Sequence, residues 1–97
     1  MEIIVDRDHF TVELDGQVVR VRGEIDLAVR PALEKALSRM RANQPAVLDL
    51  AGVTFIDSAG LACVLDATKH EAGATLGSMS PAVMQLLELT GTADLFG

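Results

Sequence analysis

The hydrophobic pattern of this chain changes its period several times, and these changes limit the folds that it can adopt. Between Phe10 and Arg22, apolar and polar residues alternate on either side of Asp15-Gly16. This pattern is typical of two half-buried strands joined by a tight turn, and Asp-Gly favours type I′. Farther along, apolar residues recur at every third or fourth position, as in a helix that buries one face. A hairpin followed by alternating helices and strands predicts an α/β domain with a mixed sheet.

The boundaries of the elements follow from the same pattern. We expect strands at residues 3–5, 10–14, 17–22, 46–50 and 74–79, and helices at 26–42, 58–73 and 80–89. Pro31 is compatible only with the first turn of its helix, so the regular helix should begin near it. Residues 46–50 form a nearly continuous apolar run, which suggests a strand buried on both faces. A turn and a second short apolar run that ends at Asp57 should follow.

Length and composition exclude several classes of function. The 97 residues are 49% hydrophobic and 23% charged, which fits one globular domain over 1–97. A net charge of -6 argues against nucleic acid and against direct contact with an anionic membrane. Cys63 is the only cysteine, so no internal disulfide can form and a reducing cytoplasm fits. Asp49 and Asp57 lack further ligands nearby in the sequence, and we expect no metal or cofactor.

Ser58 is the candidate functional residue, because it lies where a loop becomes the N-terminus of an apolar helix. Free backbone N–H groups gather at such a point, and the helix dipole favours negative charge. The hydroxyl could therefore cap the helix, act as a nucleophile or accept a phosphate. Asp57 is an alternative cap for this helix, and Asp26 is a good candidate cap for the first helix.

The residues around Ser58 lack the parts of a hydrolase. A Gly-x-Ser-x-Gly elbow would need glycine where Ile56 stands. A nucleophilic serine also needs a base. The two histidines, His9 and His70, lie before the first hairpin and at the far end of the second helix. We therefore expect no catalytic residue and no enzyme.

Four short motifs follow one another along the chain. They are Gly23-Glu24-Ile25-Asp26, Pro31-Ala32-Leu33, Ile56-Asp57-Ser58-Ala59-Gly60-Leu61 and Ser80-Pro81-Ala82-Val83. In this order they resemble the STAS domain, above all that of the bacterial anti-sigma-factor antagonists, also called anti-anti-sigma factors. The resemblance extends over residues 9–95. It implies a STAS-like mixed sheet of about four to five strands, with helices packed mainly on one face.

The resemblance also implies a function. Such a protein binds an anti-sigma factor, typically also a serine kinase, and so releases the sigma factor. The kinase phosphorylates the motif serine, here Ser58, the phosphorylated protein no longer holds its partner, and a phosphatase reverses the modification. The partner-binding residues that the motifs imply are Asp26, Asp57, Ser58, Ala59, Gly60 and Leu61.

A phosphate at Ser58 is physically suited to such a switch. It adds about −1.5 to −2 charges, which a helix N-terminus tolerates. The same charge, next to Asp57 in the centre of a docking surface, would oppose binding of the partner. Ala59 and Gly60 are small and should keep the approach to the hydroxyl open.

The chain departs from familiar antagonists in two places, and other functions fit a STAS domain. The segment 61–73 is about one helical turn shorter, and the chain stops at Gly97, where those proteins continue through a last strand and a helix. This leaves an apolar face that a partner or a second copy, in a homodimer, could cover. The alternatives are a regulatory subunit of an ABC-type lipid-transport complex and a scaffold subunit of a stress-signalling assembly. Serine, rather than the threonine frequent in transporter subunits, favours the sigma pathway.

Overall fold

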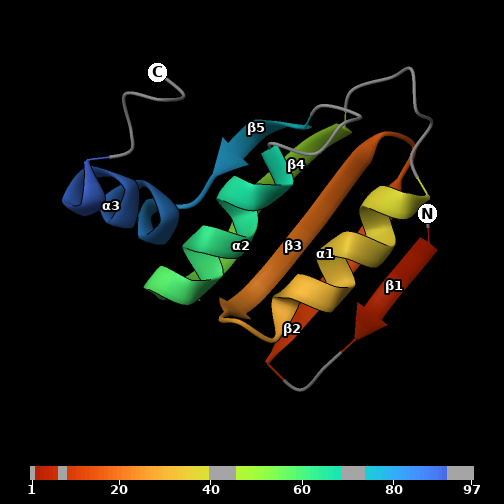
Figure 1. The fold of residues 1–97 in the computed structure, drawn as a ribbon, viewed down its shortest axis with the longest axis horizontal. Coiled ribbons are helices and arrows are strands. Elements are labelled where there is room, and N and C mark those ends of the chain that lie inside the picture. Colours follow the sequence, from red (N-terminus) through yellow and green to blue (C-terminus); the bar gives the residue numbers. More distant parts are fainter. Residues whose placement is uncertain (1, 7–8, 40–45, 69–73, 92–97) are drawn as a thin grey trace.

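A five-stranded mixed sheet carries two helices on one face and a third helix at one edge (Figure 1). The computed structural model describes residues 2–6, 9–39, 46–68 and 74–91. In chain order the elements are β1 (Glu2–Asp6), β2 (Phe10–Asp15), β3 (Val18–Ile25), α1 (Val29–Ser38), β4 (Ala46–Ile56), α2 (Ser58–Thr68), β5 (Ala74–Met79) and α3 (Pro81–Thr90).

The strands lie in the sheet in the same order as in the chain. β1, β2 and β3 pair antiparallel, whereas β3, β4 and β5 pair parallel. The predicted α/β class and mixed sheet are therefore confirmed. The turn between β2 and β3 is Gly16-Gln17, flanked by the pair Asp15 and Val18. Only Gly16 has a positive φ, 60°. This matches a type II′ turn, so the expected type I′ is wrong.

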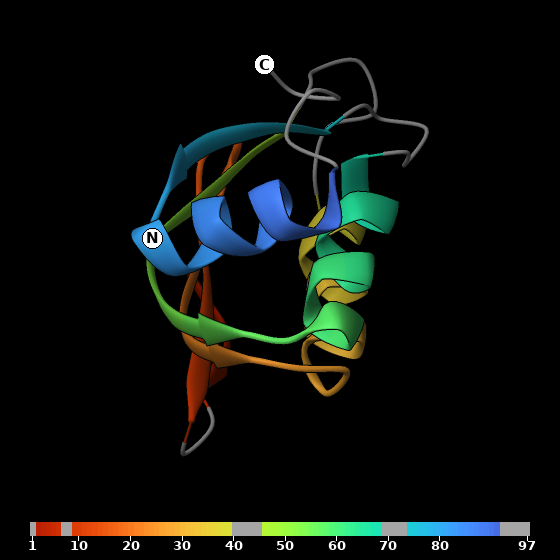
Figure 2. The same cartoon turned by 90° about the vertical axis from the view of Figure 1, so that its left-hand side faces the viewer.

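Helices α1 and α2 form a second layer on one side of the sheet, and α3 lies across the edge between the two layers (Figure 2). The buried residues of α1 recur at helical spacing, at Val29, Ala32, Leu33, Ala36 and Leu37. They pack with alternate residues of the strands, such as Val19, Val21, Leu48 and Leu50, which are fully buried. Cys63 belongs to this core, and burial raises the pKa of its thiol.

Strand β4 differs from its prediction in two respects. It is one strand of 11 residues rather than a short strand, a turn and a second run. Its pairing with β3 skips a residue twice: Arg20 faces Asp49 but Arg22 faces Gly52, and the register shifts again after Gly23. Two extra residues in β4 therefore form bulges, which break the alternation of apolar residues. Its first five residues alternate between buried and partly exposed, so the expected burial on both faces is wrong.

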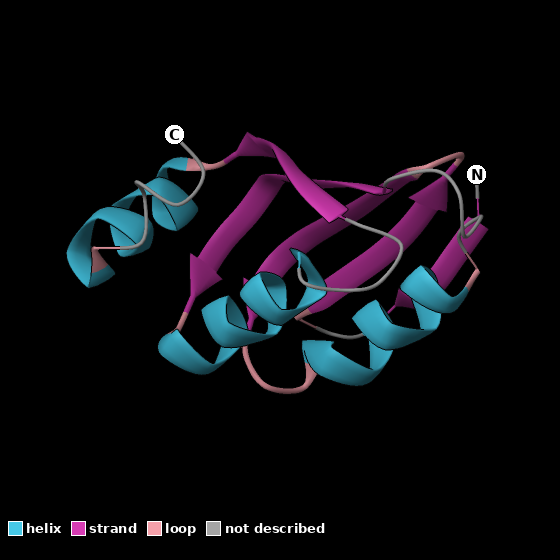
Figure 3. Cartoon of the chain, turned by 45° about the horizontal axis from the view of Figure 1, so that its top comes forward, coloured by secondary structure: helices cyan, strands magenta, loops and turns pink. Residues whose placement is uncertain are grey.

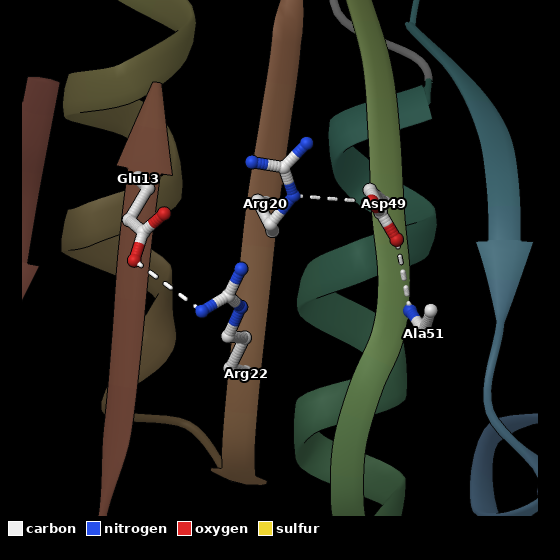
Figure 4. Close-up of polar contacts among 5 residues, drawn as sticks. All are labelled: Glu13, Arg20, Arg22, Asp49 and Ala51. Carbon is white, nitrogen blue, oxygen red and sulfur yellow. Dashed lines mark hydrogen bonds and ion pairs between the residues drawn. The ribbon is translucent and has the colours of Figure 1, made fainter. Parts of the chain in front are cut away.

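Charged residues cover part of the open face of the sheet (Figure 4). The Nε atom of Arg20 in β3 donates to Asp49 Oδ2 in β4 at 3.2 Å. The other oxygen of Asp49 accepts a hydrogen bond from Ala51 N at 3.0 Å, inside the first bulge. Arg22 and Glu13 form a looser ion pair at 3.8 Å. This face is polar because no described helix covers it.

The helix ends partly follow the sequence signals. α1 begins at Val29, so Pro31 lies in the first turn as expected. Ser80 caps α3 by accepting a hydrogen bond from Val83 N, with Pro81 as first residue and Gly91 left-handed at the end. Helix α1 ends at Ser38 with Arg39 as its C-cap, so the predicted end near residue 42 is wrong. The predicted end of the second helix, at 71–73, lies outside the described residues.

Candidate functional site

The candidate site lies at the carboxyl ends of the parallel strands β3 and β4. Their last residues, Ile25 and Ile56, are register partners. The next residues in the chain, Asp26 and Asp57, therefore leave the sheet side by side, and Asp57 N donates to Ile25 O at 3.2 Å. Figure 3 shows the connections into α1 and α2 at this same end of the sheet. Parallel α/β sheets commonly place binding sites at this end.

Asp57 is the cap of α2. Its Oδ1 accepts a hydrogen bond from Gly60 N at 2.7 Å, and its carbonyl accepts the first helical hydrogen bond, from Leu61 N at 2.9 Å. A side chain that bonds the backbone three residues on is the normal geometry of a helix cap. Of the two caps that the sequence allowed, Asp57 is therefore the one that forms.

Ser58 therefore does not cap the helix. It is the first residue of α2, and its side chain is exposed. Within the described part of the chain, its hydroxyl has no hydrogen-bond partner, and neither have the backbone N–H groups of Ser58 and Ala59. An accessible hydroxyl beside two free N–H groups at a helix N-terminus is a favourable setting for a phosphate.

Gly60 and Leu61 face the core. Leu61 is 4% exposed. Gly60 is buried, and a Cβ built on it would stand 2.5 Å from Ile25 O. Gly60 therefore lets α2 approach the end of β3, which is a structural role and not the open approach to Ser58 that we expected. Of the six predicted partner-binding residues, the structure exposes Ser58 and Ala59 and leaves Asp26 and Asp57 partly exposed.

Asp26 supports the turn before α1 rather than capping the helix directly. Its Oδ1 accepts from Ala28 N at 2.9 Å, and its carbonyl accepts from Val29 N at 3.1 Å. No side chain caps α1, so the predicted cap at Asp26 is replaced by this turn. The second oxygen of Asp26 lies 3.7 Å from His9 Nε2, which makes an ion pair when the imidazole is protonated.

A hollow of about 220 Å³ lies beside the two aspartates. Its lining includes His9, Glu24 and Phe55, which are not among the predicted partner-binding residues. Strand pairing brings them together, because Glu24 N donates to His9 O at 2.7 Å and Glu24 is the register partner of Phe55. In the sequence, Gly23 is the residue that could have indicated this close contact between the strands. Its φ of 96° and the close approach of His9 O require glycine at this position.

The described residues include no cluster of histidine, cysteine or carboxylate side chains that could hold a metal ion. Among the helices of the described segments, none is long and apolar enough to cross a membrane. His70, considered above as a base, lies outside the described residues.

Known proteins resemble this chain in sequence and structure. Residues 9–97 match the family model described as "Mlab, STAS domain". The Anti-sigma-F factor antagonist RsfB, from two strains of Mycobacterium tuberculosis, is 35% identical over 88 residues, which cover 81% of this chain and 71% of that protein. The crystal structure of an anti-sigma factor antagonist from Mycobacterium paratuberculosis is 33% identical, with a TM-score of 0.68 over 94% of this chain and 86% of that one.

Proposed function

Because this chain belongs to the STAS domain family, we propose that it is an anti-sigma factor antagonist, which binds an anti-sigma factor and thereby frees a sigma factor. Its role is that of a regulatory binding protein without catalytic activity of its own. Phosphorylation of Ser58 by the anti-sigma factor, acting as a serine kinase, ends the interaction, and a phosphatase restores it. The names of the relatives that it matches support the first step of this proposal.

The capping of α2 by Asp57 is the observation that carries the Ser58 switch. Since Asp57 and not Ser58 satisfies the helix N-terminus, the serine hydroxyl is exposed and its modification breaks no hydrogen bond of the described fold. A kinase can reach it, and the two free N–H groups beside it can accept the phosphate charge. A capping serine would have to give up its bond first.

The effect of the phosphate on binding follows from its charge. Ser58 lies beside Asp57, on a surface that also presents Asp26 and Glu24. An added charge of about −1.5 to −2 makes this surface more negative and adds a strongly hydrated group at its centre. A loss of about 3 kcal/mol of binding free energy would weaken the complex more than a hundredfold.

We expect Ser58→Asp to weaken binding to the anti-sigma factor at least tenfold, and Ser58→Ala to bind like the wild-type protein. The affinities are measured by titration calorimetry with the anti-sigma factor of the organism that makes this chain. Incubation with that protein and ATP, followed by mass spectrometry, should add one phosphate at Ser58 to the wild-type chain and none to Ser58→Ala.

Ser78→Asp is the matched control, because Ser78 is also an exposed serine but lies in β5. It adds the same charge to the protein and should leave the affinity within about twofold. Equal affinities of Ser58→Asp and wild type would refute the charge switch. Failure of the wild-type chain to bind any anti-sigma factor, or capture of a transporter ATPase instead, would refute the proposed function itself.

A further inference from the structure

Phe55 is an aromatic side chain exposed where a core residue would be expected. Its exposed fraction is 54%, whereas Phe10, the other described phenylalanine, is 3% exposed. It lies in β4, three residues before Ser58. Large exposed aromatic side chains carry a disproportionate share of the binding energy at protein interfaces.

Two hollows meet at Phe55. On one side is the hollow of about 220 Å³ that it lines with Asp26 and Asp57. On the other side is a groove of about 360 Å³ between the end of β4 and helix α3, to which Phe55 also contributes. Phe55 therefore joins the surface around the Ser58 motif to a second surface on α3.

The groove exists because β5 is shorter than β4. The last residue pair between these strands is Leu50 and Met79, so the remainder of β4 has a strand only on its β3 side. Helix α3 packs against this part of β4 and buries Val83 and Leu87. Leu86 is left half-buried at the groove and Leu89 is 76% exposed. On the side formed by α3 the groove is thus mostly apolar, with Ala82, Leu86 and Leu89 beside one polar residue, Gln85.

The hollow differs from the groove in its charge. Carboxylates of Glu24, Asp26 and Asp57 line it, with His9 as the one group that can become positive. The side chain of Glu24 makes no ion pair or hydrogen bond within the described residues. A partner that occupies both surfaces must therefore present apolar side chains next to basic ones.

We propose that Phe55 is the anchor of the partner-binding surface, and that it receives a segment of the anti-sigma factor with apolar side chains for the β4–α3 groove and an arginine or lysine for the acidic hollow. This inference rests on the proposed function and specifies the chemistry of the partner. It extends the interface from Ser58 toward α3. A phosphate on Ser58 weakens this interface because it offers the partner's basic side chain a competing anion outside the hollow and places a strongly hydrated group where the partner must dock, which costs more than the added attraction contributes.

The test uses the full chain and the same anti-sigma factor, with affinities measured by titration calorimetry. Phe55→Ala should weaken binding at least tenfold, and Phe55→Leu, which keeps an apolar side chain, should lose less than threefold. Ile3→Ala is the matched control, because Ile3 is 59% exposed but lies in β1, at the other edge of the sheet. It should bind like the wild type. Urea unfolding of each variant verifies that it is folded.

The charge of the partner is tested with Glu24→Gln, which removes a carboxylate without breaking a described side-chain contact. It should weaken binding about threefold and reduce the dependence of the affinity on salt concentration.

Wild-type affinity in a folded Phe55→Ala, while Ser58→Asp still weakens binding, overturns the inference and leaves the proposed function intact. A wild-type homodimer in sedimentation that Phe55→Arg dissociates would assign the groove to a second copy and also overturn it. No binding by the wild type overturns both proposals.

Discussion

Gly60 shows how one residue without a side chain sets the position of the functional helix. The N-terminus of α2 lies so close to the end of β3 that a Cβ on Gly60 would stand 2.5 Å from Ile25 O and 2.9 Å from Ile25 C. Both atoms belong to the backbone and cannot rotate away. Because Asp57 N also donates to Ile25 O, the same carbonyl fixes the cap and limits the size of the residue at 60. The glycine therefore positions Ser58 indirectly.

The expected effect of Gly60→Ala follows from this contact. In an ordinary helix interior the change would stabilise the protein by up to about 1 kcal/mol. Here the displaced helix should reduce the free energy of unfolding by about 1–3 kcal/mol, as overpacking does. Urea unfolding measures it. Ala62→Gly, at an exposed position of α2, gives the propensity effect alone, a loss of about 1 kcal/mol. A more stable Gly60→Ala protein would show that α2 can move away from β3 without cost.

At the scale of elements, β4 depends on the side chain of Asp49. One carboxylate oxygen bonds Arg20 of the neighbouring strand, and the other bonds Ala51 N within the bulge. The bulge shifts the register between Arg20 and Arg22, and so sets which residues of the last half of β4 face the helices. Asp49 therefore supports the register that places Phe55 outside and Ile56 inside, where Ile56 is 7% exposed.

Two replacements of Asp49 distinguish the contributions of these two contacts to the free energy of unfolding. Asp49→Ala removes both and should lower the free energy of unfolding by about 1–3 kcal/mol, because Arg20 and Ala51 N lose their acceptors. Asp49→Asn keeps a carbonyl oxygen for Ala51 N and should lose about half as much. Chemical denaturation of the two variants and of Arg20→Leu provides the comparison. Equal losses for alanine and asparagine would mean that the bond to Ala51 N contributes nothing to the strand.

The same strand shows which parts of the fold could be read from the sequence. The hairpin and the alternation of helices and strands that follows it depend on residues close together in the chain, and each was predicted. The bulges of β4 were not, because a skipped residue moves Val53 and Ile56 out of the two-residue period on which a strand is recognised. Ala51-Gly52 therefore looked like a turn, although the strand continues through it.

The candidate site, like the fold, was predictable where its residues are close together in the chain. The Ser58 motif and both aspartates are visible in the sequence, and local capping rules allowed either Asp57 or Ser58 to cap α2. In the structure Asp57 is the cap, because its Oδ1 accepts from Gly60 N. The hollow is not visible in the sequence, because His9, Glu24 and Phe55 meet only through the pairing of three strands. Residues brought together by register leave no local signal.

For the whole molecule, the layered architecture separates binding from stability. Helices α1 and α2 bury their apolar faces on one side of the sheet, and the core contains none of the exposed residues of the site. Ser58 lies at the rim of this layer, at the start of α2. A charge there acts on the surface, and the nearest elements of the fold that respond to it are the helix dipole and the carboxylate of Asp57.

These two responses have opposite signs, which predicts that phosphorylation switches binding without unfolding the domain. The N-terminal dipole of α2 favours the phosphate by about 0.3–1 kcal/mol, and repulsion from Asp57 offsets part of this gain. The free energy of unfolding of the phosphorylated chain should therefore stay within about 1 kcal/mol of the unmodified one, with the same dependence on urea. The comparison needs urea unfolding and amide hydrogen exchange of both forms. Loss of exchange protection in α2 after phosphorylation would show instead that the switch acts by melting the helix that carries Ser58.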